Sequence, residues 1–229
     1  MKDEILTHPE MCLRHRVSLQ AGMNFRQPPQ HGIILMSRRP NAPYDDEMSD
    51  DESVLIYEGH DARRNEASDP KAVDQPRRTP AGSLTQNGKF AASVEKAKRG
   101  ESKFPIFRVY EKMRVGIWTD RGLYVLRDYA VQQSGLRKVF KFWLEQAGHD
   151  SSDETADPPH DLPMTRQIPS WVKQQVFKRD KGQCQICHAT DNLHFDHDFP
   201  YSKGGTSLTP DNVRILCARH NLQKSDRIE

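Results

Sequence analysis

Hydrophobic residues in the first two thirds of the chain mostly follow the spacing of β-strands. In residues 104–113 (FPIFRVYEKM), Phe107 and Val109 alternate with the residues of a second face, which is the period-two pattern of a strand. Further strands are predicted within 26–37, at 54–57, at 122–132 and at 136–146, with a turn at Ser134-Gly135.

Helical spacing is found in fewer segments. Phe90, Val94 and Ala97 recur every three or four positions within residues 89–102, and Gly100 is suited to end this helix. A short helix is also expected within the first 25 residues. Ser170 is predicted to cap the N-terminus of a further helix, whose packing stripe comprises Trp171, Val172 and Val176. These elements together predict an α+β fold.

The composition changes between residues 147 and 166, which read AGHDSSDETADPPHDLPMTR. Gly, Ser, Asp and Pro dominate there, and large apolar residues are almost absent. Such a composition is typical of a linker. We therefore expect two domains, at residues 1–146 and 167–229, joined by a linker at 147–166.

Composition and charge narrow the class of protein. The chain has 34 Lys and Arg against 32 Asp and Glu, a net charge of +2, so a surface for nucleic acid has to come from local clustering. Only four cysteines are present, which predicts no disulfide framework and a reducing compartment. No apolar run approaches membrane length, and the polar start MKDEILTHPE does not read as a signal peptide.

Four residues near the C-terminus have the spacing of a zinc site. Cys184 and Cys187 are separated by two residues, and so are Cys217 and His220. Two such pairs, each held by one tight turn, suit tetrahedral coordination of Zn2+. Because protein groups would fill all four positions, the zinc is expected to be structural. A zinc ribbon that serves only as a scaffold or binding module is the alternative.

The residues around these ligands resemble the HNH (His-Me finger) endonuclease module. The matching pieces are the Asp-His pair in HFDHDFP, the asparagine in PDNVRIL and the ending CARHNLQK. The resemblance implies two strands, a loop and a helix (a ββα-metal unit) around one catalytic cation. Carried over by position, it implies His197 as the general base, Asp196 and Asn221 as the ligands of the cation, and Asn212 as the residue that orients the base and its loop.

These residue types suit phosphodiester hydrolysis. A histidine titrates near neutral pH and can take a proton from the attacking water. A hard cation such as Mg2+ or Mn2+ prefers oxygen ligands and stabilises charge on the leaving oxygen. For His197 the alternative is a surface histidine in a turn. Lys203 and Lys224 are candidates for phosphate contacts, with a solvated side chain as the alternative for each.

Several short pieces within residues 26–146 occur in a characteristic order. They are RQPPQHGI, Tyr44-Asp45-Asp46, VLIYEGHD, Asp74-Gln75, LTQNGKFA, FRVY, Asp120-Arg121-Gly122-Leu123-Tyr124 and KVFKFWL. In this order they resemble the SRA (YDG) domain, a reader of modified cytosine, which implies a twisted β-barrel or sheet with flanking helices. The chain has Asp-Arg-Gly where the family has Tyr-Asp-Gly, and its acidic loop after Tyr44 differs in length.

The SRA resemblance implies a pocket that encloses a cytosine extruded from the duplex. Tyr44 and Tyr57 match the stacking aromatics, with ordinary strand packing as the alternative. Asp46, with Asp45 as the alternative, matches the acid that accepts from the cytosine amino group. Glu58 and Gly59 are implied to line the methyl end. The arginines implied to contact phosphate or to fill the gap left by the flipped base are Arg63, Arg64, Arg77 and Arg78.

We therefore expect a modification-dependent, type IV-like restriction endonuclease. It would recognise 5-methylcytosine, or a related modified cytosine, in double-stranded DNA by base flipping and hydrolyse phosphodiester bonds with its HNH site. Because one HNH site cuts one strand, a homodimer is expected. We expect no nucleotide cofactor and no membrane, and a location in a bacterial cytoplasm. The alternatives are a modified-DNA binding protein that does not cleave and an HNH nuclease indifferent to modification.

Overall fold

The computed structural model describes residues 3–64, 67–147, 167–200 and 205–224. The chain divides into two compact units. The central unit comprises residues 17–112 and 121–150, and the terminal unit comprises 1–16, 113–120 and 151–229. None of the helices in the described part of the chain has the length and apolar character needed to cross a lipid bilayer.

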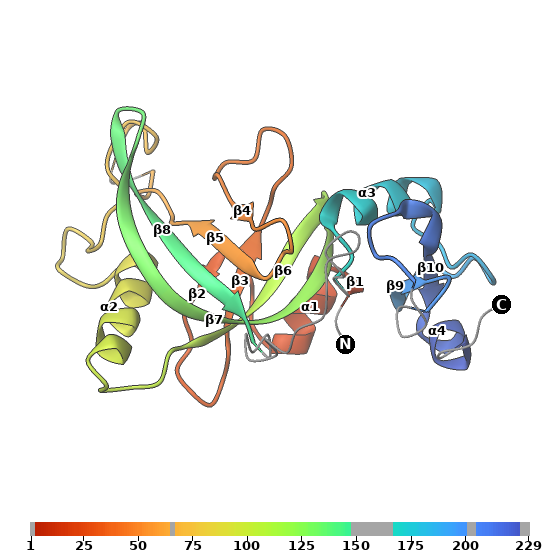
Figure 1. The fold of residues 1–229 in the computed structure, drawn as a ribbon. Helices are drawn as coiled ribbons and strands as arrows, with labels where there is room; N and C mark the ends of the chain where they lie inside the picture. The colour runs from red at the N-terminus through yellow and green to blue at the C-terminus, as the bar shows by residue number, and fades with distance from the viewer. Residues whose placement is uncertain (1–2, 65–66, 148–166, 201–204, 225–229) are drawn as a thin grey trace, which may run out of the picture. The chain divides into compact units, whose positions relative to one another are not determined.

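The central unit is built on a strongly twisted sheet (Figure 1). Strands β2, β3, β6 and β7 lie side by side, and β8, β5 and β4 continue the sheet from β7. The pairing of β3 with β6 is parallel, whereas the pairings of β8 with β7 and β5 are antiparallel. The strands span Met23–Asn24 (β2), Gly32–Met36 (β3), Glu47–Met48 (β4), Val54–Glu58 (β5), Ile106–Arg114 (β6), Ile117–Ser134 (β7) and Arg137–Gln146 (β8).

Helix α2 (Gln86–Lys98) closes one side of this sheet and completes the core. Phe90 is fully buried, with its ring centroid 4.4 Å from that of Phe107 and 5.3 Å from that of Phe142. Burial of one such side chain stabilises the fold by about 1.5–3 kcal/mol. The helix begins earlier than predicted, because the Thr85 hydroxyl accepts a hydrogen bond from the Gly88 N–H and caps it. It ends just before Gly100, as predicted.

Strands β7 and β8 form a long hairpin. Their pairing runs from Tyr124 opposite Gln146 to Ser134 opposite Arg137, with an irregularity between Leu126 and Asp128. The predicted turn at Ser134-Gly135 is confirmed, and Gly135 has a φ of 59°, which favours glycine. Pairing with β5 stops at Lys141, so the closed end of the hairpin extends beyond that strand (Figure 1).

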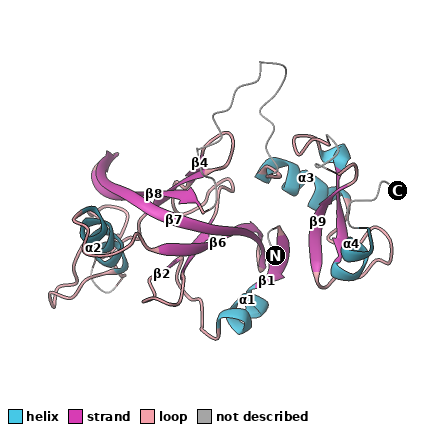
Figure 2. Ribbon diagram, turned by 60° about the horizontal axis from the view of Figure 1, so that its bottom comes forward, coloured by secondary structure: helices cyan, strands magenta, loops and turns pink. Residues whose placement is uncertain are grey.

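The terminal unit contains strands β1, β9 and β10 and the start of β7, with helices beside them (Figure 2). Strand β1 lies between the start of β7 and β9, with Ile5 opposite Thr119 on one side and Leu193 on the other. Strand β9 pairs with β10 in antiparallel fashion. The elements are β1 (Glu4–Thr7), α1 (His8–His15), α3 (Ser170–Arg179), β9 (Leu193–His197), η2 (Pro210–Asn212), β10 (Val213–Cys217) and α4 (Ala218–Lys224).

This arrangement is a mixed sheet with few helices, and it confirms the predicted α+β fold with a twisted sheet and a C-terminal ββα unit. The N-terminal helix is present as α1, but the strand that precedes it was not predicted. The proposed linker 147–166 lies outside the described residues except for residue 147, so the domain boundaries stay a prediction. Residues 1–16 nevertheless group with the C-terminal segment, because β1 pairs with β9.

The prediction for the start of α3 was wrong in two respects. Pro169 holds the N-cap position without a side-chain hydrogen bond, and Ser170 is the first helical residue. Trp171 is 50% exposed, whereas Val172 and Val176 are fully buried. Positions i and i+4 share one face of a helix, and the residue before them points about 100° away, so Trp171 lies outside the stripe.

Candidate functional site

A cavity of about 390 Å3 opens on the central unit. Of the residues predicted for the base pocket, Tyr44, Asp46 and Glu58 line it, whereas Tyr57 and Gly59 do not. Asp45 also lines the cavity. The remaining lining residues are Ser37, Arg38, Arg39, Asn41, Ala42, Pro43, Lys71, Ser134 and Arg137. The cavity is therefore mainly polar and charged, with one aromatic ring in its wall.

The two predicted stacking tyrosines do not face each other across an open slot. The Tyr44 ring stacks on His60, with centroids 5.0 Å apart and planes 10° from parallel. Tyr57 is 1% exposed, and its hydroxyl lies 3.1 Å from His60 Nε2. His60 thus contacts both tyrosines. Burial lowers the pKa of the His60 imidazole to about 4, so the ring is neutral at physiological pH.

Tyr44 has a second partner in Lys71. The Lys71 ammonium lies 4.4 Å from the centroid of the Tyr44 ring, which is a cation–π contact. Lys71 Nζ is also 3.0 Å from Asp61 Oδ2 and is 46% exposed. An incoming planar group that stacks on Tyr44 therefore has to displace either a buried, neutral imidazole or a half-exposed lysine. The lysine is the easier of the two to move because water can solvate its ammonium.

Asp46 is the buried acid of the cavity. Its Oδ2 accepts from the Ser37 N–H at 3.0 Å and its Oδ1 from the Glu58 N–H at 3.1 Å. Burial raises the pKa of Asp46 to about 7, although these two backbone donors lower it. The Asp45 side chain, by contrast, is 79% exposed and lies 3.5 Å from Lys141 Nζ. The geometry thus favours Asp46 as the acid that can contact a bound base.

Arg137, which also lines the cavity, is held by two ion pairs. Its guanidinium lies 3.3 Å from Glu58 Oε1 and 2.5 Å from Asp61 Oδ1. Gln75 joins this cluster through bonds from its side-chain N–H to the Gly59 carbonyl at 2.7 Å and to Glu58 at 3.3 Å. The Glu58 carboxylate is therefore buried and contacts the buried side chains of Arg137 and Gln75.

The four arginines predicted for DNA contact differ in their surroundings. Arg63 and Arg64 are exposed. Arg77 is held by Glu95 at 2.7 Å and donates to the Tyr129 hydroxyl at 3.3 Å. Arg78 donates to the Gly82 carbonyl at 2.6 Å. Since Arg78 is exposed like Arg63 and Arg64, the half-buried and ion-paired Arg77 is the member of this set least free to reach DNA.

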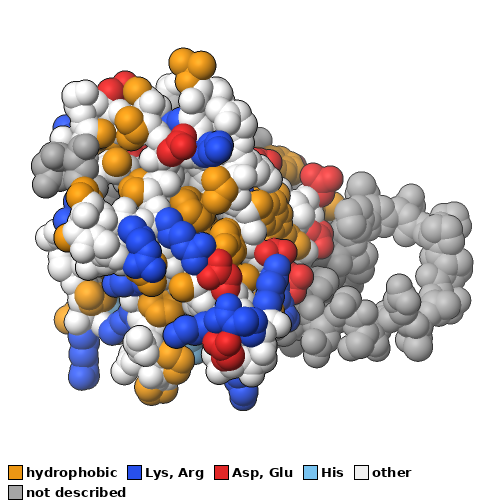
Figure 3. Space-filling view, turned by 90° about the vertical axis from the view of Figure 1, so that its left-hand side faces the viewer, with side chains coloured by type: hydrophobic (Ala, Val, Ile, Leu, Met, Phe, Trp, Pro, Cys, Tyr) orange, Lys and Arg blue, Asp and Glu red, His pale blue; other side chains and the backbone are white. Residues whose placement is uncertain are grey.

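A second groove, of about 840 Å3, lies beside α2. Its walls are largely apolar and include Phe25, Leu84, Phe104 and Ile106, while Lys89, Lys96 and Lys103 also line it. Figure 3 views the side of the molecule on which α2 lies, where Lys and Arg side chains gather among apolar ones. No residue predicted for the base pocket lines this groove.

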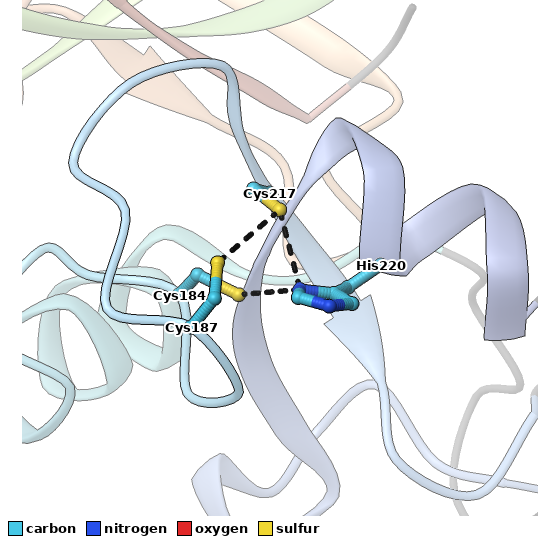
Figure 4. Close-up of side chains that lie close together, drawn as sticks. All are labelled: Cys184, Cys187, Cys217 and His220. Carbon is cyan, nitrogen blue, oxygen red and sulfur yellow. Dashed lines mark hydrogen bonds between the residues drawn. The ribbon is translucent and has the colours of Figure 1, made fainter.

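In the terminal unit, the four expected zinc ligands come together (Figure 4). The ligand atoms of Cys184, Cys187, Cys217 and His220 all lie within 4.8 Å of one another. The Sγ atoms of Cys187 and Cys217 are 3.8 Å apart, and His220 Nδ1 is 3.4 Å from the sulfurs of Cys184 and Cys217. Zinc with Zn–S bonds of about 2.3 Å places neighbouring sulfurs about 3.8 Å apart in a tetrahedron. The donor set therefore fits Zn2+.

Local backbone geometry holds the first pair of ligands. The His188 N–H donates to the Cys184 carbonyl and the Cys184 N–H to the Ala189 carbonyl, each at 2.9 Å, which closes a tight turn around the two cysteines. Burial raises the pKa of the Cys184 thiol, but backbone N–H groups, those of Cys187 and Cys217 first, outweigh it and lower the pKa to about 6. A thiol with this pKa is largely thiolate at neutral pH, the form that binds zinc.

The Asp-His pair lies at the end of β9. His197 Nε2 is 2.8 Å from the hydroxyl oxygen of Ser207, which is buried. Asp196 Oδ2 accepts from the Lys224 ammonium at 2.5 Å, and the Asp196 side chain is 18% exposed. Asn221 is half-buried on α4, and α4 packs against both β9 and β10. Asp196, His197 and Asn221 therefore lie on elements that pack together.

Asn212 fastens the loop that follows His197. Its side-chain carbonyl accepts from the Phe199 N–H at 2.8 Å, and its amide donates to the carbonyls of Phe199 and Thr206, at 3.2 and 2.8 Å. Gly205 packs beneath this amide, where an added Cβ would lie 2.0 Å from the Phe199 carbonyl oxygen. Only glycine fits there, and Asn212 can then bridge both ends of the loop.

Comparison with known proteins bears on this site directly. Residues 184–227 match the HNH endonuclease family. The C-terminal part of the chain is an HNH endonuclease domain. The protein is accordingly a metal-dependent DNA endonuclease. No curated protein matches the chain at comparable significance.

The chain is also similar to several solved structures. The SRA domain of SUVH5, in complex with hemi-methylated CG DNA, is 23% identical over 71% of this chain and 92% of that chain, with a TM-score of 0.44. The modification-dependent TagI restriction endonuclease is 17% identical over 97% of this chain and 76% of that chain, with a TM-score of 0.43. The type IV phosphorothioation-dependent restriction endonuclease ScoMcrA is 15% identical over 99% and 55%, with a TM-score of 0.41.

The alternative reading of Lys224 as a solvated side chain is wrong. Lys224 lies in the HNH domain and is only 1% exposed. Its ammonium donates to the Asp196 carboxylate and to the His197 carbonyl. A buried ammonium needs such oxygen partners, and these fix the end of β9. Lys203 lies outside the described residues.

Sequence reasoning missed several residues that contact Tyr44 or line the central cavity. His60, Lys71 and Arg137 are separated from Tyr44 by 16 to 93 positions, and no spacing in the sequence indicates that they meet it or its cavity. The signal that was available is the ending of VLIYEGHD, since His60 and Asp61 lie three and four residues after the predicted strand 54–57. Tyr57, Glu58 and Gly59 were assigned to the pocket, but His60 and Asp61 were not.

The Asp-Arg-Gly sequence, which departs from the family pattern, forms part of a buried ion-pair network. Arg121 is 1% exposed and pairs with Glu52, and its Nη1 lies 3.8 Å from Glu111 Oε2. Arg38, which lines the cavity, pairs with the same two acids at 2.8 and 3.2 Å. This network thus connects the interior of the sheet to the cavity wall.

We expect Arg121→Met to destabilise the central unit by about 3–5 kcal/mol, because it leaves buried carboxylates with one guanidinium instead of two. The matched control is Arg127→Met, which removes a half-exposed pair with Glu145 and should cost at most about 1 kcal/mol. Urea denaturation followed by tryptophan fluorescence measures both. Equal stability of the two variants would contradict this role for Arg121.

Proposed function

We propose that this protein is a modification-dependent restriction endonuclease that recognises 5-methylcytosine or a related modified cytosine in double-stranded DNA. The observation that carries the proposal is the cavity with Tyr44 in its wall and the buried Asp46 beside it, on the same chain as an HNH endonuclease domain. A nuclease that cuts DNA without regard to modification has no need of an aromatic, acid-lined cavity. The sequence order of the SRA-like pieces supports the same function.

Recognition by extrusion explains the chemistry of the cavity. Extruding a base costs a few kcal/mol of stacking and pairing, which the pocket has to offset. Tyr44 offers an aromatic face for stacking once the Lys71 ammonium moves aside. Asp46 offers a carboxylate to the exocyclic amino group of cytosine, a charge-assisted hydrogen bond. Glu58 and Arg137, which pair with each other, contribute further polar groups to the wall.

For cleavage, we assign the roles in the HNH site as follows. His197 takes the proton from the attacking water, with Ser207 and the loop held by Asn212 fixing its ring. Asp196 and Asn221 would hold the divalent cation, Mg2+ or Mn2+, which when bound supplies positive charge to the leaving oxygen. The Lys224 ammonium donates to Asp196 Oδ2 and thereby fixes the orientation of this carboxylate. Cys184, Cys187, Cys217 and His220 would hold the structural zinc.

Because one HNH site cuts one strand, we propose that a homodimer makes a double-strand break. A bacterial cell, in which incoming modified DNA would be the target, is the proposed setting. The reader without nuclease activity, the first of the two alternatives, is disfavoured by the presence of Asp196, His197 and Asn221 together. The nuclease indifferent to modification predicts equal cutting of modified and plain DNA.

Substitution of Asp46 and of Asp45 tests whether the cavity recognises modified cytosine. We expect Asp46→Asn to weaken binding of a 5-methylcytosine duplex about 10- to 100-fold, the size of a lost hydrogen bond to a charged group. Asp45→Asn, the matched control on an exposed neighbour, should bind as the wild type does. Fluorescence anisotropy with methylated and plain duplexes, in EDTA to prevent cutting, measures all three proteins. Loss of discrimination in the Asp45 variant, or none in the Asp46 variant, would refute the assignment.

Because the pKa of Asp46 is raised, both the stability of the protein and its affinity for the methylated duplex should depend on pH. Since the pKa of about 7 lies above the ordinary value of 3.8, the folded protein binds this proton more tightly than the unfolded chain. The protonated Asp46 therefore contributes to the free energy of unfolding. This contribution is fully present below about pH 4 and is lost as the pH rises through 7. Binding should change in the opposite sense: affinity for the methylated duplex should rise between pH 6 and pH 8 as the carboxylate forms. The Asp46→Asn protein should show no such rise.

A further inference from the structure

The closed end of the β7–β8 hairpin exposes two apolar side chains to solvent. Residues 131–136, which we call the hairpin tip, are all exposed. Leu136 is 100% exposed and Val131 is 50% exposed. Each apolar side chain left in water forgoes the stabilisation that burial would give, so a leucine at the end of a projecting hairpin suggests a contact with another molecule.

The hairpin tip is continuous with the cavity. Ser134 and Arg137, which face each other across the last pair of the ladder, both line the cavity. Leu136 directly precedes Arg137 and lies within this turn. A duplex that delivers a base into the cavity therefore brings its neighbouring base pairs close to the hairpin tip.

The residues that directly follow the hairpin tip are held by hydrogen bonds and ion pairs. The Lys138 N–H donates to Asp74 Oδ1 at 2.7 Å, and the Gln75 N–H donates to the Lys138 carbonyl at 2.9 Å. Arg137 is anchored by Asp61 and Glu58. The tip is therefore presented on a paired, anchored ladder, which lowers the entropy cost of inserting it into a partner.

The composition of the hairpin tip suits a duplex. Between Asp128 and Glu145 the chain has no acidic residue, and Lys138, which follows the tip closely, is exposed and positively charged. Gln132 and Gln133 have amides that can donate to and accept from base edges. Apolar side chains that enter a base step separate the stack and occupy the space between bases. Arg77, implied by the sequence for a similar role, is instead held by Glu95.

We propose that the hairpin tip enters the duplex beside the cavity and that Leu136 occupies the space in the base stack left by the extruded base. This inference rests on the proposed function, because it requires a base to leave the stack. Leu136 lies outside the short segments that resemble the SRA domain. The inference therefore assigns the gap-filling role to a hairpin residue that the resemblance does not point to.

The test compares Leu136→Ala with Leu13→Ala in the full-length protein. Leu13 is 79% exposed on α1 and provides a matched loss of one exposed leucine. The probe is a duplex with one 5-methylcytosine and a 2-aminopurine as its neighbour, and a plain duplex serves as reference. Anisotropy gives the affinities, and 2-aminopurine fluorescence reports the loss of stacking. Thermal unfolding checks that both variants fold.

We expect Leu136→Ala to lose about 10- to 100-fold in affinity for the methylated duplex, with little change for the plain one, and to lose most of the 2-aminopurine signal. Leu13→Ala should match the wild type in both. The inference is overturned if Leu136→Ala binds as the wild type does, or if both variants lose affinity equally. Should the wild type not prefer the methylated duplex, the proposed function fails first, and this inference fails with it.

Discussion

A Cys184→Ser protein is expected to lose its zinc and the folded structure of its HNH domain. Binding of structural zinc contributes about 10–16 kcal/mol in zinc-finger peptides, far more than the hydrophobic core of a small ββα unit can supply. Cys184 is fully buried and supplies one of four ligand atoms that lie within 4.8 Å of one another. A serine hydroxyl is a much poorer ligand than a thiolate, so the site would lose one of its four strong bonds.

Zinc content by mass spectrometry and limited proteolysis together measure this loss. The variant should contain no stoichiometric zinc, and the region of residues 167–229 should be cut rapidly by trypsin. Cys12→Ser is the matched control, because Cys12 lies on α1 and outside the cluster. A Cys184→Ser protein that is folded, active and free of zinc would overturn the structural role of the metal.

A His197→Ala protein is expected to bind DNA normally and to cleave it 10^2- to 10^4-fold more slowly, as is typical when a general base is lost. His197 sits at the end of β9 beside Ser207, and its removal leaves the zinc cluster and the central cavity intact. His31→Ala, which removes an exposed histidine of the central unit, is the control.

Single-turnover cleavage of a labelled duplex at saturating enzyme separates the chemical step from binding. We expect the rate of the His197 variant to fall while its affinity for the same duplex in EDTA stays within a factor of two or so. Cleavage near the wild-type rate would show that another group accepts the proton. A parallel loss of affinity would indicate that His197 contributes to binding instead.

Some features of this molecule follow from the sequence because their causes are local. The zinc ligands could be predicted because each pair is held by one turn, and such a turn fixes the spacing in the sequence. The strands β5, β6 and β8 could be predicted because alternation between two faces repeats at every second residue. The end of α2 at Gly100 and the turn at Gly135 have equally local causes.

Other features depend on contacts between distant segments and could not be predicted. Strand β1 joins the terminal unit by pairing with residues more than 100 positions away, and its four residues carry no distinctive pattern. Lys224 reads as a surface residue because only the fold brings Asp196 against it. The position of His60 between the two tyrosines depends on the path of the chain after β5, which Asn87 of α2 fixes through two hydrogen bonds to the His60 backbone.

The measurement that tests the central claim most directly is cleavage of one plasmid in matched unmethylated and cytosine-methylated forms, with Mg2+ or Mn2+ and with EDTA. We predict that only the methylated form is cut, that cutting requires the divalent cation and that EDTA stops it. Equal cutting of both forms would contradict the claim, because the protein would then be an HNH nuclease that does not read modification. Methylated DNA that is bound but never cut would contradict it as well, since the chain would then be a reader alone.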